Sequence, residues 1–178
     1  MTPLQMFREG RAVLRARTQL RSAERLGPRV RVWGRLAVGN YGRLVIGDRV
    51  RLVSTLAPLE LSVGEEATLE IEDGVFINHG GSIAAMKSVF IGKNATIGPH
   101  CLILDNEFHR LEPERRSERP ESRPVRIEEN VWLGARVIVL PGVTIGAHTV
   151  VGAGSVVTKS LPERVVAAGV PARVIRAL

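Results

Sequence analysis

The chain has 178 residues, of which 44% are apolar, 24% charged and only 4% aromatic, with 18 glycines, one cysteine and a formal net charge of +7. This length suits one domain with a substantial core, and a single cysteine excludes both an internal disulfide and a cysteine-rich zinc site. No apolar run is long enough to cross a membrane and no signal-peptide pattern is present, so we expect a cytoplasmic protein. An aliphatic, glycine-rich composition favours regular stacked strands.

The positive charge is concentrated near the N-terminus. Residues 1–51 carry 12 arginines against three acidic residues. Such a basic segment suits nucleic acid, an anionic membrane surface or a solvated helix. Because aromatic residues for base stacking are few and no nucleic-acid-binding motif is present, we expect no nucleic acid partner.

Residues 1–28 are predicted to form a basic amphipathic helix. Thr2 suits the N-cap, Gln5 completes a capping box, and Gly27 with Pro28 would end the helix. This helix would pack on its own domain or on a sister subunit, and the alternative is contact with an anionic membrane. The apolar residues at helical spacing are Met6, Phe7, Val13, Leu14 and Leu20.

From Ile127 the sequence repeats every six residues. The first positions are aliphatic, and they are Ile127, Leu133, Val139, Ile145, Val151 and Val157. The fifth positions are small or aliphatic, and they are Val131, Val137, Val143, Thr149, Ser155 and Leu161. A fifth position and the first position that follows it face the same side of a strand, so both are predicted to point inward. Glycine and asparagine at second and fourth positions suit tight corners, and the whole pattern predicts a β-helix.

The same phase appears upstream of this run, at Ile91, Ile97 and Ile103, with weaker copies beginning at Ile46 and Ile71. Residues 104–123 interrupt the repeat with a polar, charged, proline-bearing stretch that is predicted to be a loop. A long irregular loop in so regular a scaffold is more often functional than accidental. We therefore expect a helix over 1–28 and a β-helix domain over 29–178 that carries this loop.

The segment from Pro124 to Arg176, with its motifs NVWLGARV, VVGAGSVVTK and PARVIR, resembles the C-terminal signature of the hexapeptide-repeat acyltransferases. The match is closest to the maltose, galactoside and nodulation O-acetyltransferase group. The resemblance implies an all-β fold, a left-handed parallel β-helix with three hexapeptides per turn. It further implies acetyl-CoA as the acyl donor and a homotrimer with its sites at the subunit interfaces.

Acyl transfer from a thioester to a hydroxyl needs a base that is neutral near pH 7, as imidazole is. His109 lies in the loop, outside any repeat position, and the resemblance implies that it is the general base. Asp105 would orient its ring or bind the acceptor, or otherwise cap the loop. Asn78 is implied near the acceptor. His100 and His148 occupy fourth positions and are expected at solvent-facing corners.

The donor site is also implied by the resemblance. Trp132 would line the donor tunnel, the alternative being a flat outward ring that covers a face of the coil. Small residues suit close approach of the pantetheine arm, and they are Ala135, Gly152 and Ala153. Three cations would bind the CoA phosphates, and they are Lys159, Arg173 and Arg176. The alternative is that they are ordinary charges at the end of the coil.

Two other chemistries are not expected. Cys101 occupies an inward fifth position, where a thiol is usually inert. The γ-type carbonic anhydrases share this fold and bind a metal through three histidines, two of them five residues apart. His79, His100 and His109 contain no such pair, so we expect no metal.

The predicted function is transfer of acetyl from acetyl-CoA to a hydroxyl of a saccharide or polysaccharide precursor. Two alternatives stay open. One is N-acylation of a nucleotide-linked amino sugar, and the other is a non-catalytic β-helix that serves assembly or membrane docking through its basic helix.

Overall fold

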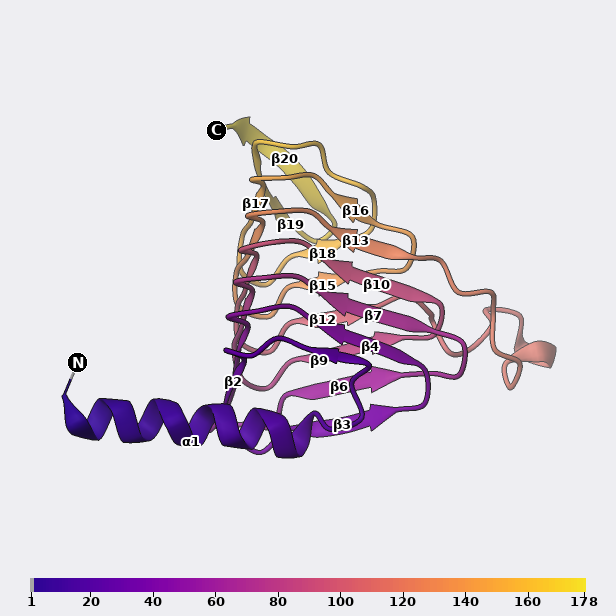
Figure 1. The fold of residues 1–178 in the computed structure, drawn as a ribbon. Coiled ribbons are helices and arrows are strands. Elements are labelled where there is room, and N and C mark those ends of the chain that lie inside the picture. The colour runs from indigo at the N-terminus through magenta and orange to yellow at the C-terminus, as the bar shows by residue number, and fades with distance from the viewer. Residues whose placement is uncertain (1) are drawn as a thin grey trace.

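The computed structural model describes residues 2–178 as one N-terminal α-helix followed by a coil of 20 short strands, with a short 3-10 helix, η1 (Pro113–Arg115), in the loop between β12 and β13 (Figure 1). Helix α1 (Pro3–Gln19) lies across the first turn of this coil, which has the form of a three-sided prism. In Figure 1 the nearer strands run right to left and the farther strands run left to right as the chain climbs, so the coil is left-handed. The fold is the parallel β-helix that the repeat predicts.

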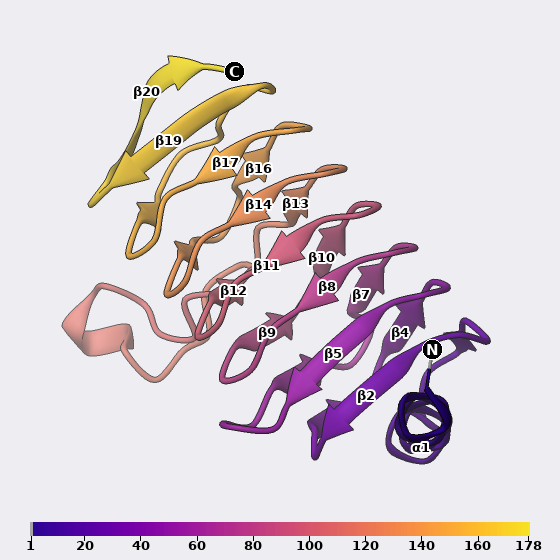
Figure 2. The same ribbon diagram turned by 90° about the vertical axis from the view of Figure 1, so that its left-hand side faces the viewer.

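Each side of the prism is a parallel sheet, and the three sheets are named A, B and C here (Figure 2). Sheet A contains β1 (Arg25–Leu26), β4 (Arg43–Ile46), β7 (Thr68–Ile71), β10 (Ser88–Ile91), β13 (Val125–Ile127) and β16 (Thr144–Ile145). Sheet B contains β2 (Arg31–Gly34), β5 (Arg51–Ser54), β8 (Phe76–Ile77), β11 (Thr96–Ile97), β14 (Trp132–Leu133), β17 (Val150–Val151), β19 (Val165–Gly169) and β20 (Ala172–Ala177). Sheet C contains β3 (Ala37–Asn40), β6 (Glu60–Val63), β9 (Ser82–Ala85), β12 (Leu102–Leu104), β15 (Ile138–Val139) and β18 (Val156–Val157). Among the strands of residues 2–178, β20 alone runs antiparallel to its neighbour, β19.

The chain passes from sheet A to B to C and back to A, which defines an A–B corner, a B–C corner and a C–A corner. All twelve first and fifth positions predicted from Ile127 onward are buried inside the coil. Thr149 and Ser155 are the polar members of that set, and both hydroxyls donate to backbone carbonyls, of Pro162 at 2.7 Å and of Gly152 at 2.6 Å. The predicted inward face is thus confirmed, and its hydroxyls are satisfied.

The corners depend on residues that accept a left-handed backbone. Fourth positions of the repeat have positive φ, including Asn94 at 56°, His100 at 59°, Asn130 at 53° and His148 at 62°. Asparagine and histidine are enriched in this region among residues other than glycine. The predicted corner roles of His100 and His148 are therefore confirmed.

Close stacking of successive turns makes the second-position glycines intolerant of a side chain. A Cβ on Gly98 would lie 2.7 Å from the carbonyl carbon of Gly134, whereas a Cβ on Gly10 of α1 meets nothing within 4 Å. We expect Gly98→Ala to lower the free energy of unfolding by about 1–3 kcal/mol through overpacking. The matched change Gly10→Ala should raise it by about 0.5–1 kcal/mol through helix propensity. Thermal unfolding followed by circular dichroism measures both, and a shift of the same sign in the two variants would contradict this account.

Helix α1 is shorter than predicted. It begins with the predicted capping box, in which the Thr2 hydroxyl accepts the Gln5 amide and the Gln5 side chain accepts the Thr2 amide. It ends at Gln19, whose side-chain amide accepts from Leu36 N at 2.7 Å and donates to the Gly34 carbonyl at 3.1 Å. Residues 25–26 then pair with β4, so the coil begins inside the segment predicted as helical; Met1 lies outside the described residues.

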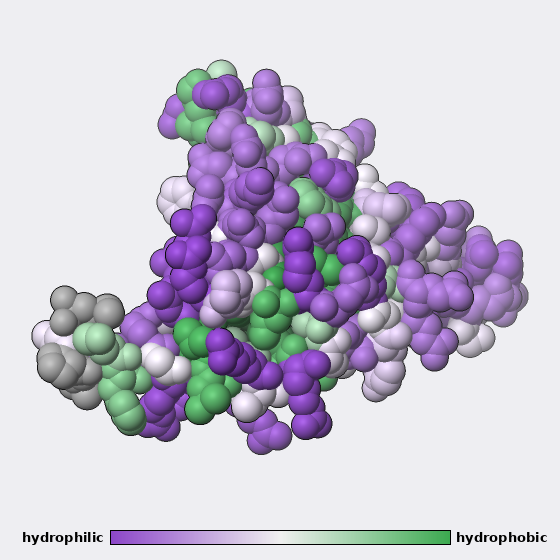
Figure 3. All heavy atoms as spheres, in the orientation of Figure 1, coloured by the Kyte–Doolittle hydropathy of each residue, from purple (hydrophilic) through white to green (hydrophobic). Residues whose placement is uncertain are grey.

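The packed face of α1 also differs from the predicted one. Ala12, Ala16 and Leu20 are fully buried against the coil, while Met6, Phe7 and Leu14 are 58–63% exposed. Alanine permits close approach of the helix to the coil, and the N-terminal half projects beyond the coil, where no other element of residues 2–178 covers it (Figure 1). In the view of Figure 3 the surface is mostly hydrophilic, and hydrophobic residues emerge mainly along α1 and over the lower turns of sheet A. No helix in residues 2–178 is long and apolar enough to span a membrane.

Candidate active site

The predicted loop is present between β12 and β13, and it projects from the C–A corner (Figures 1 and 2). Asp105 lies at its base, fully buried. The Asp105 carboxylate accepts three backbone amides of the preceding turn at 2.7 Å each, those of Met86, Lys87 and Ser88. The prediction that Asp105 orients the His109 ring is therefore wrong in this structure, because both oxygens serve the corner; the alternative, a cap for the loop, fits these contacts.

Asn106 is a second buried anchor of the loop, and the sequence analysis missed it. Its side-chain nitrogen donates to the Pro120 carbonyl at 2.9 Å and to the Ser122 hydroxyl at 2.8 Å. Its side-chain oxygen accepts the amide of Phe108, a residue with φ of 63°. Asn106 thus joins the two legs of the loop. The available signal was an asparagine two residues before a tight bend, the usual position of such a side chain in a turn.

His109 is held by the same loop. Its Nδ1 lies 2.9 Å from the backbone carbonyl oxygen of Arg116. Because a carbonyl oxygen only accepts, Nδ1 carries the hydrogen and the neutral ring keeps its lone pair on Nε2. Within residues 2–178 no hydrogen bond engages Nε2, and the side chain is exposed. In the neutral ring Nε2 is therefore the nitrogen that can accept a hydrogen bond, and no side chain or backbone group of residues 2–178 supplies one.

Ion pairs stiffen the outer part of the loop. Arg115 lies 2.7 Å and Arg110 3.3 Å from the Glu118 carboxylate. Hydrogen bonding from Arg115 lowers the pKa of Glu118 below its usual range. Arg123, at the end of the loop, lies 2.8 Å from Glu107. These exposed pairs each contribute little stability, but together they restrain the segment that presents His109.

A row of outward side chains runs up sheet B. Strand register places Arg31 beside Arg51, Arg51 beside Phe76, and then Thr96, Trp132 and Val150 in succession. Trp132 is 54% exposed. Its indole is therefore a large apolar surface that faces outward between Thr96 and Val150.

The B–C corner carries Asn78 beside the small residues. Asn78 follows β8, and its side-chain oxygen accepts both the amide and the Nδ1 hydrogen of His79 at 2.9 Å. The His79 ring stands perpendicular to that of His100, with centroids 5.3 Å apart. Higher on the same corner the chain presents Ala135, Gly152 and Ala153, all at least partly accessible.

The three predicted cations do not share one place. Arg173 and Arg176 belong to β20, opposite Ala168 and Val166, and both are exposed at the upper end of sheet B. Lys159 follows β18, at the C–A corner. Two cations therefore lie on the side of Trp132, and one lies on the side of the loop.

The predicted site residues thus divide into two groups. On sheet B and the B–C corner are Asn78, Trp132, Ala135, Gly152, Ala153, Arg173 and Arg176. At the C–A corner are Asp105, His109 and Lys159. These two corners are opposite edges of sheet C, and no hydrogen bond or ion pair joins the groups within residues 2–178. One chain alone does not bring His109 to Asn78 or Trp132.

Cys101 is not placed as a nucleophile. It is buried, its thiol donates to the Gly134 carbonyl at 3.2 Å, and burial raises its pKa. In the described part of the chain no three histidine, cysteine or acidic side chains are grouped as metal ligands.

The coil, its hexapeptide register and the loop define a β-helix protein of the hexapeptide-repeat class. Residues 124–159 match the family described as "Bacterial transferase hexapeptide (six repeats)". The chain is 34% identical over 163 residues to galactoside O-acetyltransferase of Escherichia coli (strain K12), covering 84% of this chain and 79% of that enzyme. It is 44% identical over 104 residues to galactoside O-acetyltransferase of Lactococcus lactis, covering 58% of this chain and only half (50%) of that enzyme.

The fold is also similar to that of a solved acetyltransferase structure. A hexapeptide-repeat-containing acetyltransferase from Vibrio cholerae, complexed with acetyl coenzyme A, has a TM-score of 0.67 and 27% identity, covering 97% of this chain and 86% of that one. The chain belongs to the hexapeptide-repeat acetyltransferases, which are acetyl-CoA-dependent acyltransferases.

Proposed function

We propose that this protein is an O-acetyltransferase that moves the acetyl group of acetyl-CoA to a hydroxyl of a saccharide or polysaccharide precursor. The observation that carries the proposal is the unengaged Nε2 of His109 on an anchored loop. Sequence similarity to galactoside O-acetyltransferases supports ester formation on a sugar.

His109 acts as the general base in this reaction. Its Nε2 takes the proton of the acceptor hydroxyl as that oxygen attacks the thioester carbonyl carbon. The tetrahedral oxyanion then collapses, the carbon–sulfur bond breaks, and the departing CoA sulfur takes the proton from the imidazolium. The hydrogen bond from Nδ1 to the Arg116 carbonyl favours the charged ring during transfer. No covalent intermediate with the enzyme is required.

The donor lies along sheet B and the B–C corner. The outward Trp132 offers an apolar wall, and the small residues Ala135, Gly152 and Ala153 leave the backbone accessible to an extended pantetheine arm. Guanidinium groups suit phosphate oxygens, so Arg173 and Arg176 hold the CoA phosphates.

The complete site forms between copies of the chain in a homotrimer. Support comes from the division of the site residues, with His109 and Lys159 at the C–A corner and the remaining contacts at or near the B–C corner. In a closed threefold arrangement the C–A corner of one subunit meets the B–C corner of the next, giving three equivalent sites.

The activity is tested by incubating the protein with acetyl-CoA and a panel of neutral and amino sugars while free CoA thiol is measured. Mass spectrometry of the product, before and after mild alkali, separates an alkali-labile ester from a stable amide. Ester formation supports the proposal. Amide formation alone would replace it with N-acylation, and the absence of any thiol release would contradict both.

Complementation of two inactive variants tests the interface. His109→Ala removes the base, and Ala153→Trp places a large side chain at the exposed B–C corner, where it blocks the donor. An equal mixture that is dissociated and reassembled should recover about a quarter of the wild-type rate, because a site is intact only when its His109 comes from the Ala153→Trp chain and its donor corner from the His109→Ala chain. The control is the same mixture without dissociation. No recovery after verified reassembly would mean that each site lies within one chain.

A further inference from the structure

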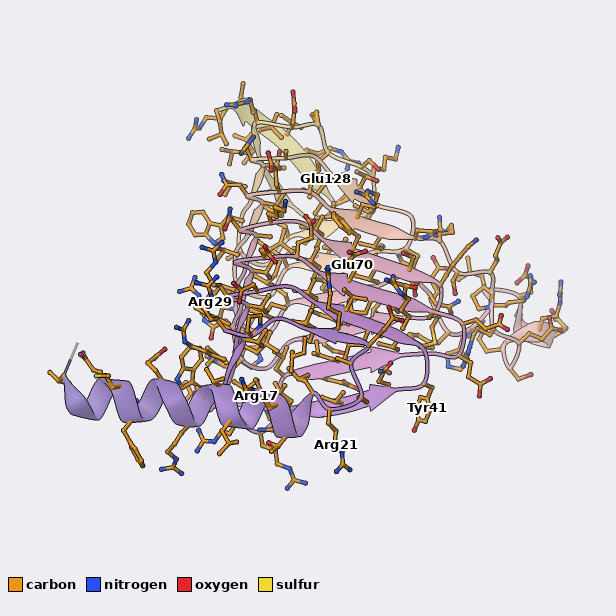
Figure 4. All side chains as sticks on the ribbon, viewed as in Figure 1. Arg17, Arg21, Arg29, Tyr41, Glu70 and Glu128 are labelled. Carbon is orange, nitrogen blue, oxygen red and sulfur yellow. The ribbon has the colours of Figure 1, made fainter. Side chains whose placement is uncertain are left out.

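The A–B corner carries a cluster of arginines that the proposed reaction does not use. Arg29, Arg31, Arg49 and Arg51 line a shallow hollow of about 410 Å³ together with Gly74 and Asn94. Arg31 and Arg51 are directly in register on β2 and β5, so the cluster spans two successive turns of the coil. Figure 4 places Arg29 on the sheet B side of the molecule, above α1.

Carboxylates near the cluster neutralise it only in part. Asp48 pairs with Arg29, which lowers the pKa of the Asp48 carboxyl. The same carboxylate is 3.9 Å from Arg49, and Glu9 of α1 is 2.6 Å from Arg31. Arg51 has no carboxylate within ion-pair distance in residues 2–178; its guanidinium lies 5.0 Å from the centroid of the Phe76 ring.

One more carboxylate and three more arginines lie close to the cluster and contribute to its net charge. Asp73 accepts the Asp48 amide at 2.7 Å, and it is the other acid close to Arg29. Three more arginines from α1 line an adjoining hollow of about 200 Å³ beside Trp33 and Thr55, and they are Arg8, Arg11 and Arg15. This end of sheet B therefore carries seven arginines against three acids, Glu9, Asp48 and Asp73.

The hollow exists because one corner residue has no side chain. At the equivalent place on other turns the A–B corner carries Arg49, Asn94, Asn130 and His148, all with positive φ. Gly74 stands between Arg49 and Asn94 in this column, and a Cβ there would lie 2.3 Å from the Asn94 side-chain oxygen. Any side chain at this position would fill the opening between the arginines and the rest of the corner.

The cluster lies directly below the turn that carries Asn78, the residue that the family resemblance implies near the acceptor. Arg51 is one strand from Phe76 in the outward row of sheet B, Arg31 is two strands away, and Asn78 follows Phe76 in the same turn. Adjacent strands are about 4.8 Å apart, so Arg51 and Arg31 lie roughly 5–10 Å below Phe76, while Asn78 lies at the other edge of sheet B in the turn of Phe76. A phosphate or diphosphate on a sugar bound over Phe76 spans the distance to these arginines.

We propose that the acceptor is an anionic saccharide, one that bears a phosphate or diphosphate, and that Arg49 and Arg51 bind its phosphate oxygens. This inference rests on the proposed function. The planar guanidinium matches phosphate geometry. Arg51, which lies 5.0 Å from the Phe76 ring centroid, has no carboxylate partner among residues 2–178, and the carboxylate paired with Arg49 is 3.9 Å away. The phosphates of CoA are assigned to the opposite end of sheet B, at Arg173 and Arg176.

The test compares acceptors that share one sugar: glucose, glucose 1-phosphate, UDP-glucose and glucose linked to a short polyprenyl diphosphate. The variant Arg49→Asn/Arg51→Gln keeps the left-handed corner, since asparagine occupies it at Asn94 and Asn130. Its matched control is Arg25→Gln/Arg43→Gln, which removes two arginines from sheet A on the same turns. Calorimetric titration with UDP and with inorganic pyrophosphate adds a readout that does not need catalysis.

Wild type should favour the phosphorylated acceptors, and the Arg49/Arg51 variant should raise their KM by at least about 10- to 100-fold, the range for one lost charge-assisted hydrogen bond. The KM for glucose and for acetyl-CoA should stay within about twofold, and the sheet A control should match wild type. The variant should also lose the binding of UDP and pyrophosphate. Preference for UDP-glucose or for the polyprenyl acceptor then identifies the source of the phosphate.

Equal kcat/KM for glucose and its phosphates, unchanged in the variant, would overturn the inference and leave acetyl transfer standing. A rise in the KM for acetyl-CoA alone would assign the arginines to the donor and also overturn it. If no acceptor releases CoA, the proposed function fails, and the UDP and pyrophosphate titrations still decide whether the arginines bind phosphate.

Discussion

His109→Ala is expected to lower kcat by about 10²–10⁴-fold, the usual contribution of a general base. The ring is held by one hydrogen bond to the Arg116 carbonyl and is exposed, so its removal costs the fold little. The Kd for acetyl-CoA should be unchanged, because the donor contacts lie on sheet B. Steady-state kinetics with a saturating acceptor and calorimetric titration of acetyl-CoA measure the two quantities.

His148→Asn is the matched control for this variant. His148 sits at an A–B corner with φ of 62°, which asparagine also adopts, and its ring contacts only Asn130 and Glu129 by hydrogen bond or ion pair among the described residues. Its kcat should remain within about twofold of wild type, because the site is remote from the C–A corner and the backbone is unstrained. Comparable rates in His109→Ala and wild type would remove His109 from the mechanism.

Asp105→Ala is expected to produce the largest loss of stability, a drop of about 3–5 kcal/mol in the free energy of unfolding. The change leaves three backbone amides of residues 86–88 without an acceptor at a buried corner. Because the same corner is the base of the loop, activity should fall together with order in residues 104–123. Chemical denaturation measures the first effect, and hydrogen exchange of the loop amides measures the second.

Glu121→Ala supplies the control for Asp105. The Glu121 side chain is 87% exposed and makes a single ion pair, to Lys87 at 3.5 Å. Exposed pairs of this kind contribute about 0–1 kcal/mol, so the variant should unfold almost as wild type does. Equal losses in the two variants would mean that the carboxylate of Asp105 is not what closes the corner.

The regular part of the fold was predictable because the residue types within each hexapeptide determine which positions point inward and which form the corner. Ile127 and Val131 point inward and Asn130 turns the corner for reasons visible within six residues. The helix was less predictable, since its burial depends on what lies beneath it. Met6, Phe7 and Leu14 have helical spacing, yet the chain offers a partner only to the alanine face that ends at Leu20.

Candidate site residues could be named one by one from the sequence, but their places on the coil could not. Asp105 and His109 are close in sequence, and the sequence alone does not say that the Asp105 carboxylate is used by amides 17–19 residues earlier. Nor does it say that Asn78 and His109 leave the coil at different corners. Which corner a residue occupies depends on the number of residues in every preceding turn, and the early turns are irregular in length.

Helix α1 and strand β20 cover the two ends of the coil. A stack of parallel strands ends in unpaired backbone groups, and two such ends could join and grow into a fibre. Helix α1 crosses the first turn with its own Ala12 and Ala16 buried on the face toward the coil, and β20, the last strand of sheet B, runs antiparallel to β19. Arg173 and Arg176 make that last strand cationic, so the residues assigned to the donor phosphates also discourage end-to-end polymerisation.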